Sequence, residues 1–121
     1  MSDVNKMLGK ILKEIQGGAY SNELWFVLED GTEYKMYHSQ SCCESVSIED
    51  ITGDLEDLIG SPLLVAEEVS NYNFGPKQNE YDEDYEWTFY KFATIKGSVT
   101  IRWYGSSNGY YSTSVSFVKI K

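Results

Sequence analysis

The sequence is poor in the residue types that build zinc sites and disulfide frameworks. Its 121 residues contain one histidine and two cysteines, and the cysteines are neighbours, Cys42 and Cys43. Adjacent cysteines do not pair easily with each other, so we expect free thiols in a reducing compartment. Without a second histidine or a second cysteine pair, the ligand spacing of a structural zinc site is missing. We therefore expect no metal and no cofactor.

Long apolar runs are missing as well. No stretch approaches the roughly 20 apolar residues that cross a bilayer, and the N-terminal "MSDVNKMLGK" lacks the apolar core of a signal peptide. We therefore expect a soluble, cytoplasmic protein without a membrane partner. The length and the 41% apolar content fit a single β-rich domain over residues 1–121.

Acidic residues are missing from the last part of the chain. Residues 1–86 hold all 19 acids with five basic residues, whereas residues 87–121 hold five basic residues and no acid. The two parts either attract each other within the fold or leave a basic surface that binds an anion. The overall charge of −9 argues against direct nucleic-acid binding, because phosphate contacts need clustered lysine and arginine.

The N-terminal segment has the apolar spacing of a helix. Apolar residues recur within residues 4–15 at intervals of three and four, which predicts a helix within residues 1–17. Gly9 lies in the middle of this helix and disfavours it by about 1 kcal/mol relative to alanine. A shorter helix followed by an extended segment is therefore the alternative.

The clearest local pattern is a hairpin centred on Asp30 and Gly31. An Asp-Gly pair between two β-rich runs predicts a two-residue turn, and that turn fixes the pairing of the strands. In this register Glu23 lies opposite His38. The face predicted to be core then consists of Trp25, Val27, Tyr34 and Met36.

The rest of the chain predicts further antiparallel strands. A helical turn is expected over residues 54–59 and an acidic loop over residues 72–86. Further strands are expected over residues 62–71, 87–96, 98–105 and 110–120. Because the strands follow one another as hairpins, we expect an α+β, mostly β fold. It would be a single curled antiparallel sheet or a small sandwich of about six strands, with the N-terminal helix and one short helical turn.

The main candidate site is a set of aromatic and basic residues on the C-terminal strands. Arginine and lysine among aromatic rings can stack bases and hold phosphates. This pattern favours a non-catalytic protein that binds a small anionic ligand such as a nucleotide, although aromatic residues are also common in strands for purely structural reasons. The candidate ligand-binding residues are Arg102, Tyr104, Asn108, Tyr110 and Lys91.

The acidic segment before these strands suggests an alternative function. Carboxylates on an exposed surface can imitate nucleic-acid phosphates and occupy the basic groove of another protein. The protein would then be an inhibitor of a basic host protein, of the kind that blocks a host defence. The candidate partner-binding residues are Glu80, Asp82, Glu83, Asp84 and Glu86.

A second cluster surrounds the single histidine and suggests an enzyme as a further alternative. A cysteine–histidine pair could provide a nucleophile, but the neighbouring acids oppose a thiolate by charge repulsion. The simpler interpretation is a small buried cysteine and a histidine that pairs with Glu23 or with solvent. The residues of this cluster are His38, Gln40, Cys42, Cys43 and Glu44.

Four short motifs support a family resemblance. The runs "CCESV", "IEDI", "IRWYG" and "SNGYY" resemble those of a family of small proteins of unknown function from bacteria and their viruses. The resemblance runs from "LGK" nearly to the end of the chain and implies a phage or prophage setting, but it implies no activity.

A homo-oligomer is compatible with the sequence.

Overall fold

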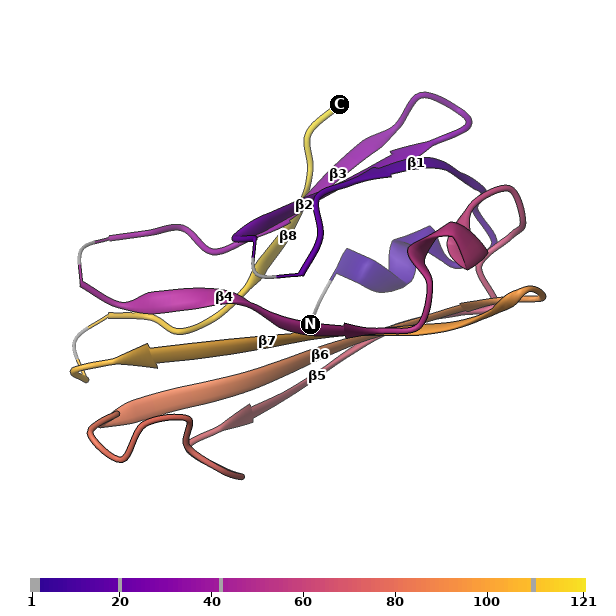
Figure 1. Cartoon of the computed structure of the whole chain (residues 1–121). Helices are drawn as coiled ribbons and strands as arrows, with labels where there is room; N and C mark the ends of the chain where they lie inside the picture. The colour runs from indigo at the N-terminus through magenta and orange to yellow at the C-terminus, as the bar shows by residue number, and fades with distance from the viewer. Residues whose placement is uncertain (1–2, 20, 42, 110) are drawn as a thin grey trace.

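The protein is a sandwich of two four-stranded antiparallel sheets, which form the upper and lower layers in Figure 1. This computed structural model describes residues 3–19, 21–41, 43–109 and 111–121. The strand orders are β1-β2-β3-β8 and β4-β7-β6-β5. The first sheet contains β1 (Leu12–Gln16), β2 (Glu23–Leu28), β3 (Glu33–Tyr37) and β8 (Ser116–Lys119). The second contains β4 (Ser45–Thr52), β5 (Val65–Tyr72), β6 (Asp84–Thr94) and β7 (Gly97–Ser107), and two short 3-10 helices complete the fold, η1 (Asp3–Met7) and η2 (Leu55–Leu58).

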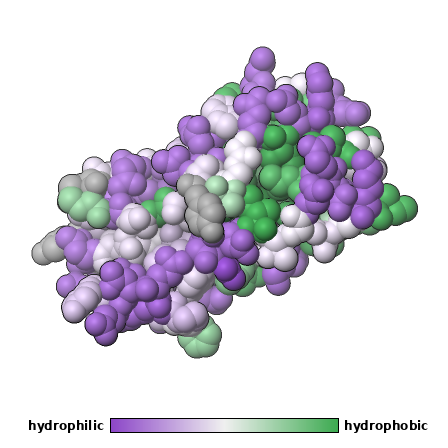
Figure 2. Space-filling model, in the orientation of Figure 1, coloured by the Kyte–Doolittle hydropathy of each residue, from purple (hydrophilic) through white to green (hydrophobic). Residues whose placement is uncertain are grey.

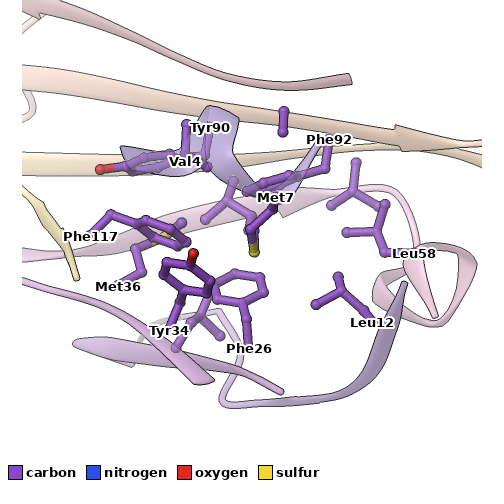
Figure 3. Packing of buried hydrophobic residues seen from close by; sticks show 14 of the residues in the cluster. Val4, Met7, Leu12, Phe26, Tyr34, Met36, Leu58, Tyr90, Phe92 and Phe117 are labelled. Carbon is purple, nitrogen blue, oxygen red and sulfur yellow. The ribbon is translucent and has the colours of Figure 1, made fainter. Parts of the chain in front are cut away.

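The apolar core lies between the two sheets. Phe26 of the first sheet meets Phe92 of the second at 5.7 Å between ring centroids, and both side chains are buried. Figure 3 shows these rings pointing toward each other, with Met7 of η1 beside them. Burying an aromatic side chain of this size stabilises the fold by roughly 1.5–3 kcal/mol before losses of entropy. The core therefore holds the sheets face to face and leaves their outer faces for other contacts.

The N-terminal helix predicted over residues 1–17 is wrong in its length, and the shorter alternative is the one observed. The 3-10 helix η1 ends at Met7, and Gly9 follows with a positive φ of 78°. That backbone conformation suits glycine and interrupts a helix. The following residues extend into β1, where Leu12 is fully buried. The apolar residues that were spaced as in one helix therefore belong to two elements, the short helix η1 and the strand β1.

The register predicted for the β2–β3 hairpin is wrong by one residue. The turn is longer than two residues, since Leu28 N donates to Thr32 O at 2.8 Å and Thr32 N donates to the Asp30 carboxylate at 2.9 Å. Trp25 therefore lies opposite Lys35. Leu24, Phe26, Leu28, Tyr34 and Met36 are buried, while Trp25 and Val27 are only half-buried on the outer face. The prediction was correct for Tyr34 and Met36 and wrong for Trp25 and Val27.

Two other departures concern β4 and β8. The strand β4 was not predicted, because its register shifts between Ile48 and Asp50 and breaks the alternation of apolar and polar residues. The last strand is shorter than predicted and pairs with β3 of the other sheet, where Phe117 stacks on Tyr34 at 5.0 Å. The strands β1 and β4 raise the number from about six to eight. The predicted helical turn is confirmed as η2, with Asp54 as its N-cap.

The surface is mixed in polarity. Figure 2, in the orientation of Figure 1, shows hydrophobic atoms gathered in part of this face, with hydrophilic atoms around them. Within the described ranges, no helix is both long and apolar enough to cross a membrane.

Candidate functional site

The outer face of the second sheet carries an aromatic and basic surface. Side chains alternate along β6 and β7, so Tyr90 and Trp103 enter the core while Trp87, Phe89 and Arg102 point to the opposite face. Phe89 lies directly opposite Arg102 in the β6–β7 pairing. The alternation predicted from the sequence for β7 thus places Arg102 on the outer face, as expected.

A cleft of about 300 Å³ opens on this face. Its walls are mostly apolar, and the charged side chain among them is that of Arg102. Trp87 and Phe89 stack in a nearly parallel arrangement, with ring planes 21° apart and centroids at 6.5 Å. The volume lies at the lower end of the range for small-molecule sites. The lining residues are Asn71, Phe74, Gly75, Pro76, Trp87, Phe89 and Arg102.

Arg102 lies at the edge of the cleft, between an aromatic ring and a carboxylate. Its guanidinium carbon is 5.4 Å from the centroid of the Trp87 ring, within the range of a cation–π contact. Its Nε donates to Glu49 Oε2 at 2.6 Å, and its Nη2 pairs with the same oxygen. Glu49 reaches Arg102 from the position where the β4 register shifts. The Arg102 side chain nevertheless remains 38% exposed, so a ligand can reach it.

The segment between β5 and β6 forms the other wall of the cleft. The Tyr85 hydroxyl donates to Gly75 O at 2.7 Å, and Trp87 Nε1 donates to Pro76 O at 2.7 Å. The Tyr104 hydroxyl accepts from Gln78 N at 3.2 Å. These bonds join three ring-bearing side chains of the sheet to the loop backbone, so the cleft has a defined wall.

Tyr104 gives the loop a pH-dependent anchor. Burial, and then its hydrogen bond to Asp82, raise the pKa of Tyr104 from 10.0 to about 12. The unfolded chain therefore releases this proton at a lower pH than the folded protein does. The stability that Tyr104 contributes is complete below about pH 10 and is lost as the pH rises toward 12.

We expect the Tyr104→Phe variant to be less stable than the parent at neutral pH, because Asp82 and the Gln78 amide lose their partner. The difference should shrink as the pH rises from 10 toward 12, because the parent loses its advantage there. Urea unfolding at neutral and alkaline pH measures this difference. A gap that stays constant across this range would show that Tyr104 does not titrate as described.

The structure brings only part of the predicted ligand-binding set together. Arg102 lines the cleft and Lys91 is exposed on the same outer face, but Tyr104 is 7% exposed and lies under the loop. Asn108 lies in the exposed turn after β7, away from the lining residues, and Tyr110 is outside the described residues. Trp87, Phe89 and Asn71 were missing from that set. The alternation of β6 could have identified the two rings, since it places them beside Arg102.

The predicted histidine cluster forms around a buried pair. His38 Nε2 is 2.7 Å from Glu44 Oε2, and His38 Nδ1 donates to Ser114 O at 2.7 Å. The side chains of His38 and Glu44 are 3% and 0% exposed. Ser41 N also donates to the Glu44 carboxylate. The partner predicted for His38, Glu23 or solvent, was wrong.

This arrangement serves to hold segments together. Both ring nitrogens of His38 already have partners, so the imidazole has no free nitrogen to offer a substrate. Gln40 Nε2 donates to Glu44 O at 2.6 Å and completes the turn into β4. Cys43 is disulfide-bonded, which corrects the expectation of two free thiols, and Cys42 lies outside the described residues. Over the described ranges, no group of three or more histidine, cysteine or acidic residues could hold a metal ion.

Three of the five acids predicted to contact a basic partner take part in bonds within the protein. Asp82 accepts from the Tyr104 hydroxyl, Asp84 from Asn73 Nδ2 and Glu86 from the Thr113 hydroxyl. Glu80 and Glu83 are exposed. Mimicry of a nucleic acid stays a prediction.

Comparisons with known proteins assign no activity to these residues. A family model described as a domain of unknown function, DUF7448, matches residues 5–117. No curated protein and no solved structure matches the chain. The match includes all residues that line the cleft and every strand up to the middle of β8.

Proposed function

We propose that this chain, which belongs to the DUF7448 family of domains of unknown function, is a non-catalytic binding protein. Its ligand is a small anion with a planar ring, such as a mononucleotide. The observation that carries the proposal is the position of Arg102 in the wall of a cleft whose other walls are mainly apolar and aromatic. Such a combination suits a ligand with one flat apolar part and one charged part.

The rings suit the planar part of the ligand. Trp87 and Phe89 lie nearly parallel, and Phe74 at the rim is 72% exposed. A base that stacks on such rings gains about 1–3 kcal/mol. The volume of about 300 Å³ favours a mononucleotide over a larger dinucleotide. Asn71, at the edge of the same cleft, offers an amide that can both donate and accept hydrogen bonds.

An anion that binds Arg102 has to compete with carboxylates of the protein itself. Arg102 is already paired with Glu49, and Asp50 Oδ2 lies 3.9 Å from its Nη2. A phosphate group must therefore displace Glu49 or bind to the donors that Glu49 leaves free. A guanidinium has five N–H donors, so it can serve two acceptors at once. The internal carboxylate weakens anion binding and gives a direct way to test it.

Ligand binding should raise the melting temperature of the protein as the concentration of a nucleoside monophosphate increases. We expect Arg102→Ala to reduce this shift to that of the nucleoside without phosphate, because stacking on the rings remains. We expect Glu49→Gln to enlarge it, because the variant no longer competes for Arg102. The nucleoside without phosphate should give a smaller shift that Glu49→Gln leaves unchanged. Differential scanning fluorimetry measures all three effects.

Lys35→Ala is the matched control. Lys35 also lies over aromatic rings, at 5.2 Å from Trp25 and 4.6 Å from Tyr37, but on the outer face of the other sheet. Its removal should leave the ligand-induced shift unchanged. Equal shifts in the parent and in Arg102→Ala, or no shift with either ligand, would contradict the proposal.

A further inference from the structure

The strand β5 forms an open edge of the second sheet, at the margin of the lower layer in Figure 1. It pairs with β6 in an unbroken register from Val65 opposite Ala93 to Tyr72 opposite Glu86. Within the described part of the chain, no strand pairs with its other side. Alternate residues of an edge strand direct their N–H and C=O groups outward. β5 thus offers unused donors and acceptors along a strand of eight residues.

The other three edges of the sandwich are protected. The register of β1 shifts after Leu12, and Leu12 O accepts from Gly60 N at 2.9 Å. The register of β4 shifts after Ile48, whose N–H donates to Ser21 O at 3.0 Å. β8 has only four residues. Bulges, coverage and short length are among the means by which proteins prevent edge pairing. Within the described residues, β5 is eight residues long, its register is unbroken and no strand covers it, while η1 packs against it and its Glu67 and Glu68 are charges of the kind that oppose self-pairing.

The side chains of β5 combine apolar and acidic groups. Val65 and Val69 are 37% and 43% exposed on the outer face, on either side of Glu67. Glu68 follows on the opposite, core-facing side, where it is half-buried and its carboxylate lies beside the Tyr90 hydroxyl. Lys91 lies across from Glu67 in β6, yet the ion pairs of the described residues include neither glutamate. A strand added here would meet two carboxylates, one on each face.

A second copy of the chain suits this edge poorly. In a symmetric antiparallel pair of β5 strands with the greatest overlap, Glu68 lies directly opposite or diagonal to its own copy. Like charges at such positions destabilise a pair of strands. A partner segment with basic residues gains from the same carboxylates. Charge therefore selects a basic partner over self-association.

We propose that β5 is a docking edge for an extended basic segment of a partner protein, which adds to the sheet as a fifth strand. Main-chain hydrogen bonds would provide the affinity and the side chains the selectivity. Because Glu67 and Glu68 point to opposite faces, the segment has two consecutive lysine or arginine residues. β-Branched residues on either side of them pack against Val65 and Val69. Asn71 of β5 also lines the cleft, but the proposed docking uses the free edge around Glu67 and Glu68 and does not depend on a nucleotide.

The test uses the full-length protein and a short synthetic peptide with two consecutive lysines between valine and threonine residues. We expect binding that weakens with salt and slows hydrogen exchange at β5 backbone amides. A Glu67→Lys, Glu68→Lys double variant should raise the Kd of the peptide by about tenfold or more. A peptide with glutamates in place of the lysines should not bind. Methylating the peptide nitrogens that face β5 should abolish binding.

A Glu14→Lys, Glu29→Lys double variant provides the matched control, because both residues are exposed acids outside β5 and the change in net charge is the same. This variant should bind the lysine peptide as the parent does. Equal loss of binding in both variants would reduce the effect to net charge and overturn the proposal. Only one set of alternate peptide nitrogens can face β5, so binding that survives methylation of each set in turn would also overturn the proposal, as would a dimer that protects β5 without peptide. Thermal melting of the Glu67→Lys, Glu68→Lys variant establishes that it is folded, so its loss of binding can be interpreted.

Discussion

Replacing Glu44 by alanine should lower the free energy of unfolding by about 3 kcal/mol or more. The Glu44 side chain is fully buried and its carboxylate meets both His38 Nε2 and Ser41 N. Because Ser114 O can only accept, His38 Nδ1 donates to it, and Nε2 lies 2.7 Å from the Glu44 carboxylate. The Glu44→Ala variant leaves the buried His38 Nε2 without that partner and removes the acceptor of the Ser41 amide. Urea unfolding measures the loss.

Two further variants separate this effect from a general loss of charge. Glu44→Gln keeps the shape and one acceptor oxygen, so it should lose less stability than Glu44→Ala. Glu23→Ala removes the carboxylate of an exposed ion pair with Lys35, whose nitrogen and oxygen are 3.2 Å apart, and should change stability little. If Glu44→Ala were no more harmful than Glu23→Ala, the buried pair would not hold the fold together.

The contacts of the His38–Glu44 pair were only partly predictable from the sequence. His38, Gln40 and Glu44 are close in the chain, so their grouping was foreseeable from proximity alone. The bond from His38 to Ser114 joins residues 76 positions apart, and no local pattern predicts such a contact. It also decides the interpretation, because it occupies the second ring nitrogen. Both ring nitrogens of His38 therefore make contacts within the protein.

For the cleft too, the alternation of side chains along a strand was predictable, whereas contacts between distant residues were not. The alternation along β7 correctly put Arg102 and Tyr104 on the face opposite Trp103. What separates the two is the loop after β5, which covers Tyr104 through Gln78 and Asp82 and leaves Arg102 exposed at the rim. The loop residues carry no periodic pattern that would predict this coverage. The direction of a side chain was therefore predictable, and its accessibility was not.

The hairpin provides the clearest error and its cause. Asp30-Gly31 is typical of a two-residue turn, but the Asp30 side chain instead accepts from Thr32 N and stabilises a longer turn. Since side chains alternate along a strand, a shift of one residue exchanges the two faces. Trp25 then leaves the core and Phe26 enters it. Two adjacent substitutions can therefore test the register directly.

We expect Phe26→Ala to lower the free energy of unfolding by about 3–5 kcal/mol. Phe26 is fully buried and contacts Phe92 and Phe117, with ring centroids at 5.7 Å and 5.9 Å. Its removal opens a cavity where the two sheets meet, and rings on both sides lose their contacts. Unfolding in urea, followed by circular dichroism, measures the change without relying on tryptophan fluorescence.

Trp25→Ala is the decisive comparison, because it removes a larger ring from the neighbouring position. Trp25 is half-buried on the outer face, where its ring contacts Lys35 and its Nε1 donates to the Glu23 carboxylate at 3.3 Å. Its loss opens no internal cavity, so the variant should be clearly more stable than Phe26→Ala. The register predicted for a two-residue turn would give the opposite order of stability, since it would place Trp25 in the core. A greater loss for Trp25→Ala would therefore contradict the observed register and, with it, the packing of the first sheet onto the second.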